Sequence, residues 1–291
     1  MNASGNNDGI KLSGLDHFRI ERCAVLNPGK GGSAIDMVGC HDGLICHNQI
    51  QDCQTSGIQA KGGCARIQIY ANVFDQAGMR PINMGGSTGM PYFRPLDAPY
   101  EAANITAWGN LFLGGETPVA FVGCEKGLFV HNTVILPKRW AARILQENND
   151  AQLIQCRNNI YANNIIVFDA NLSTFVNVGP NTHSDTFVFA NNLWFDQSTN
   201  QFDGPDLPVR ESNSIIQKNP LFSDSAAKDY HLQPKSPTIG AGGNLPSIAD
   251  ALGIDVPALG DHDEQCWNDP PSVGAFEGNP KPALQDWSKM E

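Results

Sequence analysis

The sequence predicts a right-handed parallel β-helix, in which the chain winds through stacked rungs of short strands. Two elements recur along the chain. The first is an Asn followed by any residue and then an apolar residue, and its clear copies lie 22 to 38 residues apart. A repeat of this length is typical of solenoids, propellers and arrays. The copies begin at Asn48, Asn72, Asn110 and Asn132, and near Asn163 and Asn191, where a doubled Asn leaves the register uncertain by one residue.

The second element is a short apolar segment upstream of each Asn, and most copies end in Gly. These segments are rich in β-branched and aromatic residues and are bounded by turn residues, which is typical of strands. The clear copies cover residues 10–14, 35–39, 58–62 and 82–86, and the weaker ones cover 119–123, 142–145 and 175–179.

An Asn at the same point of every rung predicts a ladder of inward-turned side chains. Each amide would bond to the amides above and below it, which satisfies polar groups that the turn would otherwise bury. A β-propeller is the alternative fold. Its blades need about 40–45 residues and antiparallel hairpins, and the sequence has neither feature.

Taken in order, the elements give about seven rungs and a C-terminal cap. We expect a β-helix domain over residues 1–240 and a cap and tail packed on it over residues 241–291. Two long insertions interrupt the rungs, and insertions of this kind are usually functional or disordered. The segments are two rungs in 8–52, a third in 56–75, insertions in 85–103 and 136–157, a last clear rung ending near Phe195, a polar loop in 196–218 and short strands in 219–240.

Composition excludes several classes of partner. The net charge is −11 and there is no basic run, so we expect no nucleic-acid partner. No apolar stretch reaches the length of a membrane span. Eight cysteines without a CxxC spacing need not form disulfides in a chain of this length. We interpret Cys46 as a core residue, in one apolar column with Tyr70, Trp108, Val130, Tyr161 and Phe189.

The N-terminus predicts an uncovered first rung. Residues 1–7 have neither the cationic nor the apolar region of a signal peptide, and little precedes the first strand at Ile10. An open end exposes unpaired backbone, so we expect either a truncated N-terminus or a second chain that covers the rung, including self-association. In its full-length context we expect a secreted or periplasmic bacterial protein.

The rung pattern and the C-terminal motifs together resemble a known family. The motifs are Asn-Pro-Leu-Phe at 219–222, Tyr-His-Leu at 230–232, Ser-Pro-Thr-Ile-Gly at 236–240 and Gly-Ala-Phe-Glu at 274–277. They resemble bacterial right-handed β-helix proteins of the pectate-lyase-like superfamily, over nearly the whole chain. Members are mostly polysaccharide lyases, glycoside hydrolases and epimerases, so the resemblance implies a carbohydrate-active protein whose partner is a polysaccharide or oligosaccharide.

One segment is similar to the alginate lyase and chondroitinase B group. It runs from Lys61 through Asn72-Val73-Phe74 and Gly78-Met79-Arg80 to Asn83-Met84-Gly85. That group uses a Lys base and an Arg one rung later, often with calcium. Lys61 matches the Lys. The family's Arg aligns best with Asn83, which makes Arg80 a displaced candidate, and the calcium-binding carboxylate pair has no clear counterpart.

The residues themselves point to one face of the first sheet. Side chains alternate along a strand, so the residues between the apolar positions turn outward, and Lys61 lies in a parallel column two residues further on. Rungs are about 4.8 Å apart, so Lys11 and Asp36 can touch, and a simple cross-rung ion pair is the alternative to a functional role. The outward column is Lys11, Asp36, Gln59, Asn83, Ala120, Arg143 and Asn177.

A lyase hypothesis follows from Lys61, which is flanked by small residues that let a substrate approach. If the amine is partly buried beside Arg80, its pKa falls, and a neutral amine can act as a general base. Lys61 would then remove the proton α to a uronate carboxylate, while Arg80 or Arg143 binds that carboxylate. On the first insertion, Arg94 would clamp a sugar stacked on Tyr92 or Phe93. The alternative for Arg80 and Arg94 is a salt bridge with Glu101.

A hydrolase is the second hypothesis, and it needs two carboxylates about 5–9.5 Å apart. Asp36 is alone in its column, Glu147 is about 19 Å away by rung count, and Glu101 would have to fold back. His41 could act as acid or base, or could be a turn residue bonded to the backbone. Calcium is the candidate cofactor, with Asp36 and Glu101 as oxygen ligands.

A non-catalytic carbohydrate-binding solenoid is the third hypothesis, and it would show a more uniform face. On the lyase hypothesis the catalytic residues are Lys61, Arg80, Asp36 and His41. The predicted substrate-binding residues are Lys11, Gln59, Asn83, Tyr92, Phe93, Arg94, Arg143, Glu147 and Asn177.

Overall fold

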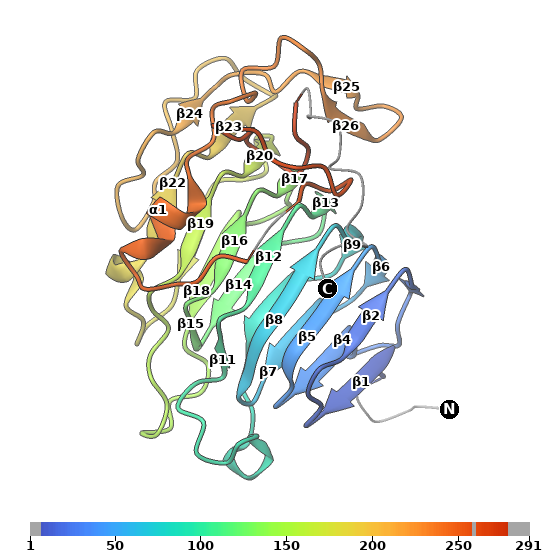
Figure 1. Cartoon of the computed structure of the whole chain (residues 1–291), viewed down its shortest axis with the longest axis vertical. Helices are drawn as coiled ribbons and strands as arrows, with labels where there is room; N and C mark the ends of the chain where they lie inside the picture. The colour runs from blue at the N-terminus through green and yellow to red at the C-terminus, as the bar shows by residue number, and fades with distance from the viewer. Residues whose placement is uncertain (1–6, 258–259, 279–291) are drawn as a thin grey trace, which may run out of the picture.

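The computed structural model describes residues 7–257 and 260–278 of the chain. Its strands stack in parallel as successive rungs, from β1 at the blue end to β24 in the orange region of Figure 1. Three long parallel sheets run the length of the stack, which confirms the right-handed parallel β-helix. No helix in the part that the structure describes is long and apolar enough to span a membrane.

Sheet A contains seven strands, in agreement with the predicted number of rungs. They are β1 (Ile10–Ser13), β4 (Ser33–Val38), β7 (Ser56–Lys61), β10 (Arg80–Gly85), β14 (Val119–Val122), β18 (Ala142–Leu145) and β21 (Val176–Val178). The register pairs every residue of the predicted outward column with its neighbour on the next rung, from Lys11 opposite Asp36 to Arg143 opposite Asn177.

Sheets B and C complete each rung. Sheet B contains β2 (Arg19–Glu21), β5 (His41–Cys46), β8 (Cys64–Tyr70), β11 (Ala102–Ala103), β12 (Thr106–Trp108), β15 (Cys124–Glu125), β16 (Leu128–Val130), β19 (Ile160–Ala162) and β22 (Val188–Ala190). Sheet C contains β3 (Ala24–Leu26), β6 (Gln49–Cys53), β9 (Val73–Ala77), β13 (Leu111–Leu113), β17 (Thr133–Ile135), β20 (Ile165–Phe168), β23 (Leu193–Asp196) and β24 (Ile215–Ile216).

The predicted asparagine ladder is present at the turn between sheets B and C. The side-chain amide of each Asn donates to the side-chain oxygen of the next, at 2.9 to 3.1 Å. The structure also resolves the doubled Asn pairs, because Asn164 and Asn192 join the ladder while Asn163 and Asn191 stand just before it with positive φ. The ladder runs Asn48, Asn72, Asn110, Asn132, Asn164 and Asn192.

The apolar column assigned to Cys46 is in fact two columns. Cys46 pairs in register with Tyr70, and Tyr70 pairs with Trp108. This column turns to the outer face of sheet B, where Trp108 packs in a cluster with the C-terminal segment. Tyr161 and Phe189 belong to the neighbouring column, which faces the interior. The prediction of one column was wrong because an apolar outer face looks in sequence like an inner one. None of the eight cysteines forms a disulfide.

The far end of the stack is closed by residues 196–216. Glu211 accepts hydrogen bonds from the backbone N–H and the side-chain amide of Asn192, the last ladder residue, and from the indole N–H of Trp194. Burial raises the pKa of Glu211, and the hydrogen bonds from Asn192 and Trp194 oppose that shift. Phe202, Leu207 and Val209 pack against the core at this end.

The remaining chain packs along the sides of the helix. A hairpin of β25 (Phe222–Asp224) and β26 (Asp229–Leu232) lies against sheet C. The short helix α1 (Leu245–Asp250) and the segment after it lie on the outer face of sheet B (Figure 1). Residues near 275 contact sheet C again.

His131, which is buried in this packing, should make the free energy of unfolding depend on pH. It is 1% exposed, its ring lies 4.2 Å from that of Trp267, and its Nε2 accepts from the Asn163 amide at 2.9 Å. Burial lowers the pKa of His131 to about 3. As the pH falls below 6.5, the unfolded chain takes up a proton that the folded chain does not. The free energy of unfolding should therefore fall by up to about 1.4 kcal/mol per pH unit towards pH 3.

The substitution His131→Asn tests this expectation, because Asn163 and Asn191 already occupy the equivalent corner of later rungs. Denaturant titrations between pH 6.5 and 3 should show a shallower loss of stability in the variant than in the original chain. His183→Asn, at a half-exposed histidine, is the control and should keep the original slope. If the free energy of unfolding falls with pH as steeply in His131→Asn as in the original chain, His131 is not the source of this pH dependence.

Candidate functional site

The predicted column on sheet A brings two lysines onto one buried carboxylate. Asp36 on β4 is 1% exposed, and its two oxygens contact the amines of Lys11 and Lys61, the latter at 3.3 Å. Lys11 also lies 3.5 Å from Asp8. Lys61 is on the rung after Asp36, and its side chain reaches back to the preceding rung to make this contact. The carboxylate of Asp36 is thus shielded from solvent and holds both amines in place.

The start of the first insertion shelters Lys61. A Cβ at Gly86 would come within 3.2 Å of the Lys61 Cδ and 2.9 Å of the Gln59 amide nitrogen, so the backbone at Gly86 lies close against both side chains. The Lys61 side chain is 17% exposed. Burial lowers the pKa of the Lys61 amine, and the carboxylates of Asp8 and Glu101 oppose that shift. Gln59 also accepts a hydrogen bond from Ser33 at 3.4 Å.

Arg80 pairs with Glu147 and not with Glu101, so the salt bridge that was the alternative role for Arg80 is formed with a different partner. The Arg80 Nη2 lies 2.5 Å from Glu147 Oε1, and Nη1 lies 3.5 Å from Asn83 Oδ1. Glu147 lies just after β18, and its carboxylate reaches the guanidinium of Arg80, which in turn lies beside Asn83.

Arg143 lies further along the same face. Its Nε donates to Asn177 Oδ1 at 3.0 Å, and its guanidinium lies 4.5 Å from the ring centre of Trp140, which Arg139 also covers at 4.1 Å. Burial lowers the pKa of Arg143, as does the nearby charge of Arg80. Trp140 is not among the residues predicted from the sequence. Its position between two arginines of the second insertion was the available signal.

Glu101 has a structural role at the base of the first insertion. It is buried, and its oxygens accept hydrogen bonds from the backbone N–H of Gly62 and Thr88, from the Thr88 hydroxyl and from the Asn148 amide, all at 2.7 to 2.9 Å. It therefore ties the two insertions to the turn after Lys61. The predicted salt bridges of Arg80 and Arg94 with Glu101 are not formed.

Removing this carboxylate should release the first insertion. We expect Glu101→Ala to cost about 2–3 kcal/mol, since it leaves buried N–H groups without partners. Limited proteolysis followed by mass spectrometry should show new cleavage within residues 86–100. Asp97→Ala, an exposed acid on the same insertion, is the control and should not change the cleavage pattern. Equal protection of both variants would exclude this role for Glu101.

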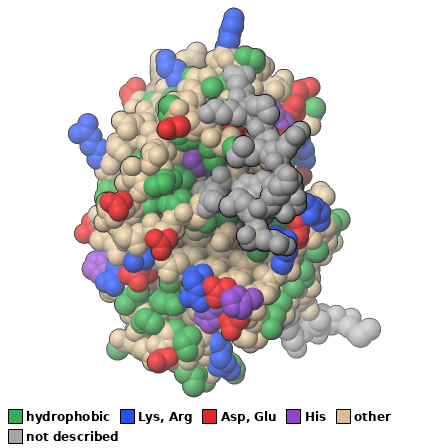
Figure 2. All heavy atoms as spheres, viewed as in Figure 1, with side chains coloured by type: hydrophobic (Ala, Val, Ile, Leu, Met, Phe, Trp, Pro, Cys, Tyr) green, Lys and Arg blue, Asp and Glu red, His purple; other side chains and the backbone are tan. Residues whose placement is uncertain are grey.

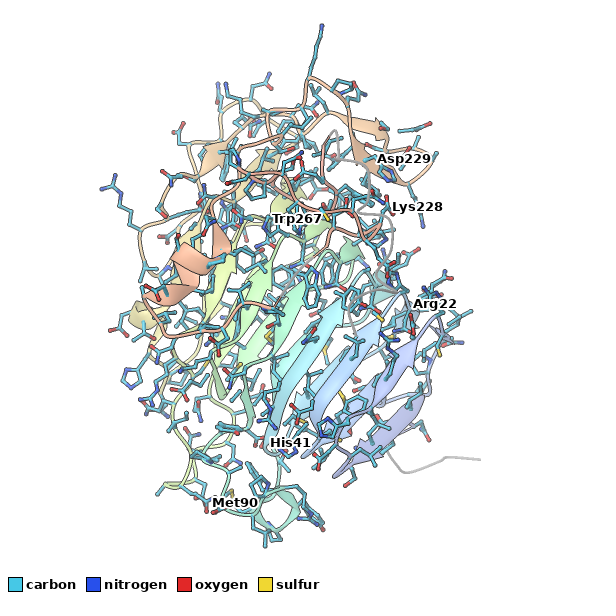
Figure 3. All side chains as sticks on the ribbon, viewed as in Figure 1. Arg22, His41, Met90, Lys228, Asp229 and Trp267 are labelled. Atoms are coloured by element: carbon cyan, nitrogen blue, oxygen red, sulfur yellow. The ribbon has the colours of Figure 1, made fainter. Side chains whose placement is uncertain are left out.

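The aromatic residues of the first insertion lie differently from the prediction. Phe93 is fully buried and packs with Ala98 and Leu153, so its ring is not available to stack on a sugar. Tyr92 is 67% exposed and remains available. The Arg94 guanidinium donates to carbonyls of its own insertion, at Pro91 and Phe93. The insertion projects from the body of the helix, as the label of Met90 shows in Figure 3.

His41 lies at the start of β5, just after the turn that follows β4 (Figure 3). Its Nδ1 is 2.9 Å from Asp16 Oδ1 and its Nε2 is 3.0 Å from the carbonyl oxygen of Gly63. Both ring nitrogens are thus engaged. These contacts fit the alternative interpretation of His41 as a turn residue bonded to the backbone. They do not fit a catalytic role beside Asp36.

The two predicted calcium ligands do not fit a calcium site in this arrangement. The oxygens of Asp36 contact two amines, and those of Glu101 accept hydrogen bonds from N–H and O–H donors. Among the described residues, no group of three or more His, Cys, Asp or Glu side chains could hold a metal ion. The outer face of sheet A therefore carries amines, guanidinium groups and amides, and the carboxylate of Glu147 is partly exposed beside them.

Comparisons with known proteins agree with the fold. A family model described as "Right handed beta helix region" matches residues 2–94, and one described as "Disaggregatase related" matches residues 129–256. No curated protein matches the chain.

Among solved structures, the chain is similar to a trypsin-treated form of QnrB1, a plasmid-mediated fluoroquinolone resistance protein. The identity is 8%, with 71% of this chain and 91% of that chain covered, and the TM-score is 0.15. A similarity this low carries no argument about fold or function. The family model for a right-handed β-helix region and the three parallel sheets together show a right-handed parallel β-helix.

Proposed function

We propose that this chain is a carbohydrate-active protein that cleaves an acidic polysaccharide by β-elimination on the outer face of sheet A. The observation that supports this most directly is the state of Lys61. Its amine is sheltered, its pKa is lowered by burial, and it is held by a carboxylate that solvent does not reach. An amine whose pKa is lowered loses its proton at a lower pH than a free lysine does, which favours its action as a general base.

In the proposed reaction, Lys61 Nζ takes the proton from the carbon α to a uronate carboxylate. The electron pair of that C–H bond forms a carbon–carbon double bond, and the glycosidic oxygen on the β carbon leaves and takes up a proton. The substrate carboxylate must be stabilised while negative charge builds on it. Arg80 is suited to this, because its guanidinium lies beside Asn83 at the centre of the face.

The next rungs would bind the adjoining sugars. Arg143 is two rungs beyond Asn83 on the same column, which is about 10 Å. Its guanidinium is fixed by Asn177 and Trp140. A second uronate could be bound there through its carboxylate. Such a polymer would be met outside the cell, at its surface or in the periplasm.

Elimination is favoured over hydrolysis by the position of the carboxylates. Hydrolysis needs two carboxyl groups that both reach the substrate or its water. Asp36 is 1% exposed and contacts two lysines, and Glu147 is paired with Arg80. Asp36 is accordingly a positioning residue for the amines.

A panel of polymers tests the proposal. The protein would be incubated with alginate, pectate, glycosaminoglycans and glucuronan, with and without calcium. The ultraviolet absorbance of an unsaturated uronate and the number of reducing ends would be followed together. We expect both to rise in parallel on one polymer. Reducing ends without absorbance would indicate hydrolysis, and binding without either signal would indicate a non-catalytic solenoid.

A further inference from the structure

A groove of about 670 Å³ crosses the outer face of sheet B. Its floor and one wall come from β5, β8, β12 and β16 and the residues beside them, and its other wall is the segment 253–257 that follows α1. In Figure 2 this face is hollowed, with acidic, basic and His side chains gathered along one side of the hollow. None of the residues of the sheet A site lines the groove.

The rungs make the groove long and regular. Leu44, Gln68, Thr106 and Leu128 pair in register across four successive strands and form the floor. The wall formed by the rungs repeats with the same spacing as the floor. Each rung bends at one wall residue, and the φ of that residue lies between 51° and 57°. Four rungs span about 14 Å. The wall residues are Asp42, Arg66, Asn104 and Lys126.

Three polar side chains in the groove have unused hydrogen-bond donors or acceptors. The amides of Gln68 and Asn104 and the hydroxyl of Thr106 make no side-chain hydrogen bond to any described residue. Thr106 is buried and belongs to the floor. They lie on two adjacent rungs, so a ligand on the floor would meet donors and acceptors together.

The charges in the groove balance. Arg66 makes two hydrogen bonds to the carboxylate of Asp42, at 2.6 and 2.8 Å, and Lys126 donates to the carbonyl oxygen of Gly253 at 3.2 Å. Arg66 and Lys126 are offset by Asp42 and Asp255. An anionic ligand would have to displace Asp42 from Arg66. An uncharged ligand has no such cost.

We propose that this groove binds a short neutral oligosaccharide that lies along the helix axis. The free amides and hydroxyl would pair with sugar hydroxyls. Leu44 and Val256, which are both part-buried, would contact the apolar faces of the rings, as is usual in sites that combine apolar walls with a few polar groups. An extended peptide fits less well, since its repeat of about 3.3 Å per residue does not match the rung spacing of about 4.8 Å.

Calorimetry and saturation-transfer NMR with three uncharged trisaccharides, cellotriose, maltotriose and mannotriose, test this proposal. We expect one of them to bind, and the double variant Gln68→Ala with Asn104→Gly to bind it about 10-fold more weakly, because two amides are lost. Glycine at position 104 keeps the positive φ without strain. Gln49→Ala, on the exposed side of sheet C, is the control and should bind normally.

Thermal unfolding of the double variant would show whether it remains folded, and the Lys61→Ala variant should bind the trisaccharide unchanged. Absence of binding at millimolar concentration would overturn the proposal. Equal binding by the double variant would do the same, as would stronger binding of trigalacturonate or of an extended tetrapeptide in the groove. These outcomes do not depend on whether sheet A is catalytic.

Discussion

Substitution of Lys61 by Ala is expected to lower the turnover of an acidic polysaccharide by about 10²–10⁴-fold, the usual contribution of a general base. The fall should appear in kcat, because the amine acts in the transition state, while KM changes less. In the original chain, activity should rise with pH as Lys61 loses its proton. Since burial lowers the pKa of this amine, the rising limb should lie below the ordinary lysine value of 10.5. Initial rates of unsaturated-uronate formation across pH measure both effects.

Lys11→Ala is the matched control for this prediction. Lys11 contacts the same carboxylate, but its side chain is 45% exposed and lies on the first rung. Loss of Lys11 should change the rate only several-fold. If Lys11→Ala and Lys61→Ala reduce kcat equally, the two lysines serve only to neutralise Asp36 and Lys61 is not the base. Circular dichroism and thermal unfolding of both variants would establish that the fold is retained.

Asn110→Ala is expected to cost about 3–5 kcal/mol of the free energy of unfolding. Asn110 is fully buried in the middle of the ladder. Its amide nitrogen donates to the Ile69 carbonyl at 2.9 Å and to Asn132 Oδ1 at 3.0 Å, and its oxygen accepts from the backbone N–H and the side-chain amide of Asn72. Alanine removes four hydrogen bonds and leaves their partners buried without water. That is a large share of the stability of an ordinary domain.

Urea unfolding followed by circular dichroism measures this loss. Asn200→Ala provides the control, because Asn200 is exposed in the loop after β23, and its free energy of unfolding should change by less than about 0.5 kcal/mol. A loss below about 1 kcal/mol in Asn110→Ala would mean that water enters the turn and replaces the missing amide. The ladder would then have little influence on stability.

Much of the fold could be predicted from the sequence because of the repeat. Each rung has the same turn chemistry, so the positions of Asn48, Asn72, Asn110 and Asn132 set the register of the strands between them. Strand alternation then gave the outward column of sheet A, from Lys11 to Asn177, and the structure confirms its pairing on every rung. The contact of Lys11 with Asp36 followed from the same register.

The insertions could not be placed in this way, because they have no period and their conformation depends on distant segments. Glu147 turned out to reach Arg80 across 67 residues of sequence. The sequence predicts Glu101 as a salt-bridge partner or a metal ligand, whereas it accepts hydrogen bonds from the backbone of Gly62 and from Asn148. Phe93 was expected at the surface and is the buried centre of its loop.

The sequence alone therefore determined the β-helix, its ladder and the face that holds Lys61, since these repeat locally in every rung. Only the tertiary structure decided which loop residues reach that face and which outer surface is covered. The covering of sheet B shows the difference most clearly. Trp108 and Tyr70 looked like core residues, and only the packing of α1 and the segment after it shows that they lie outside the helix, beside a groove that the rungs alone would not form.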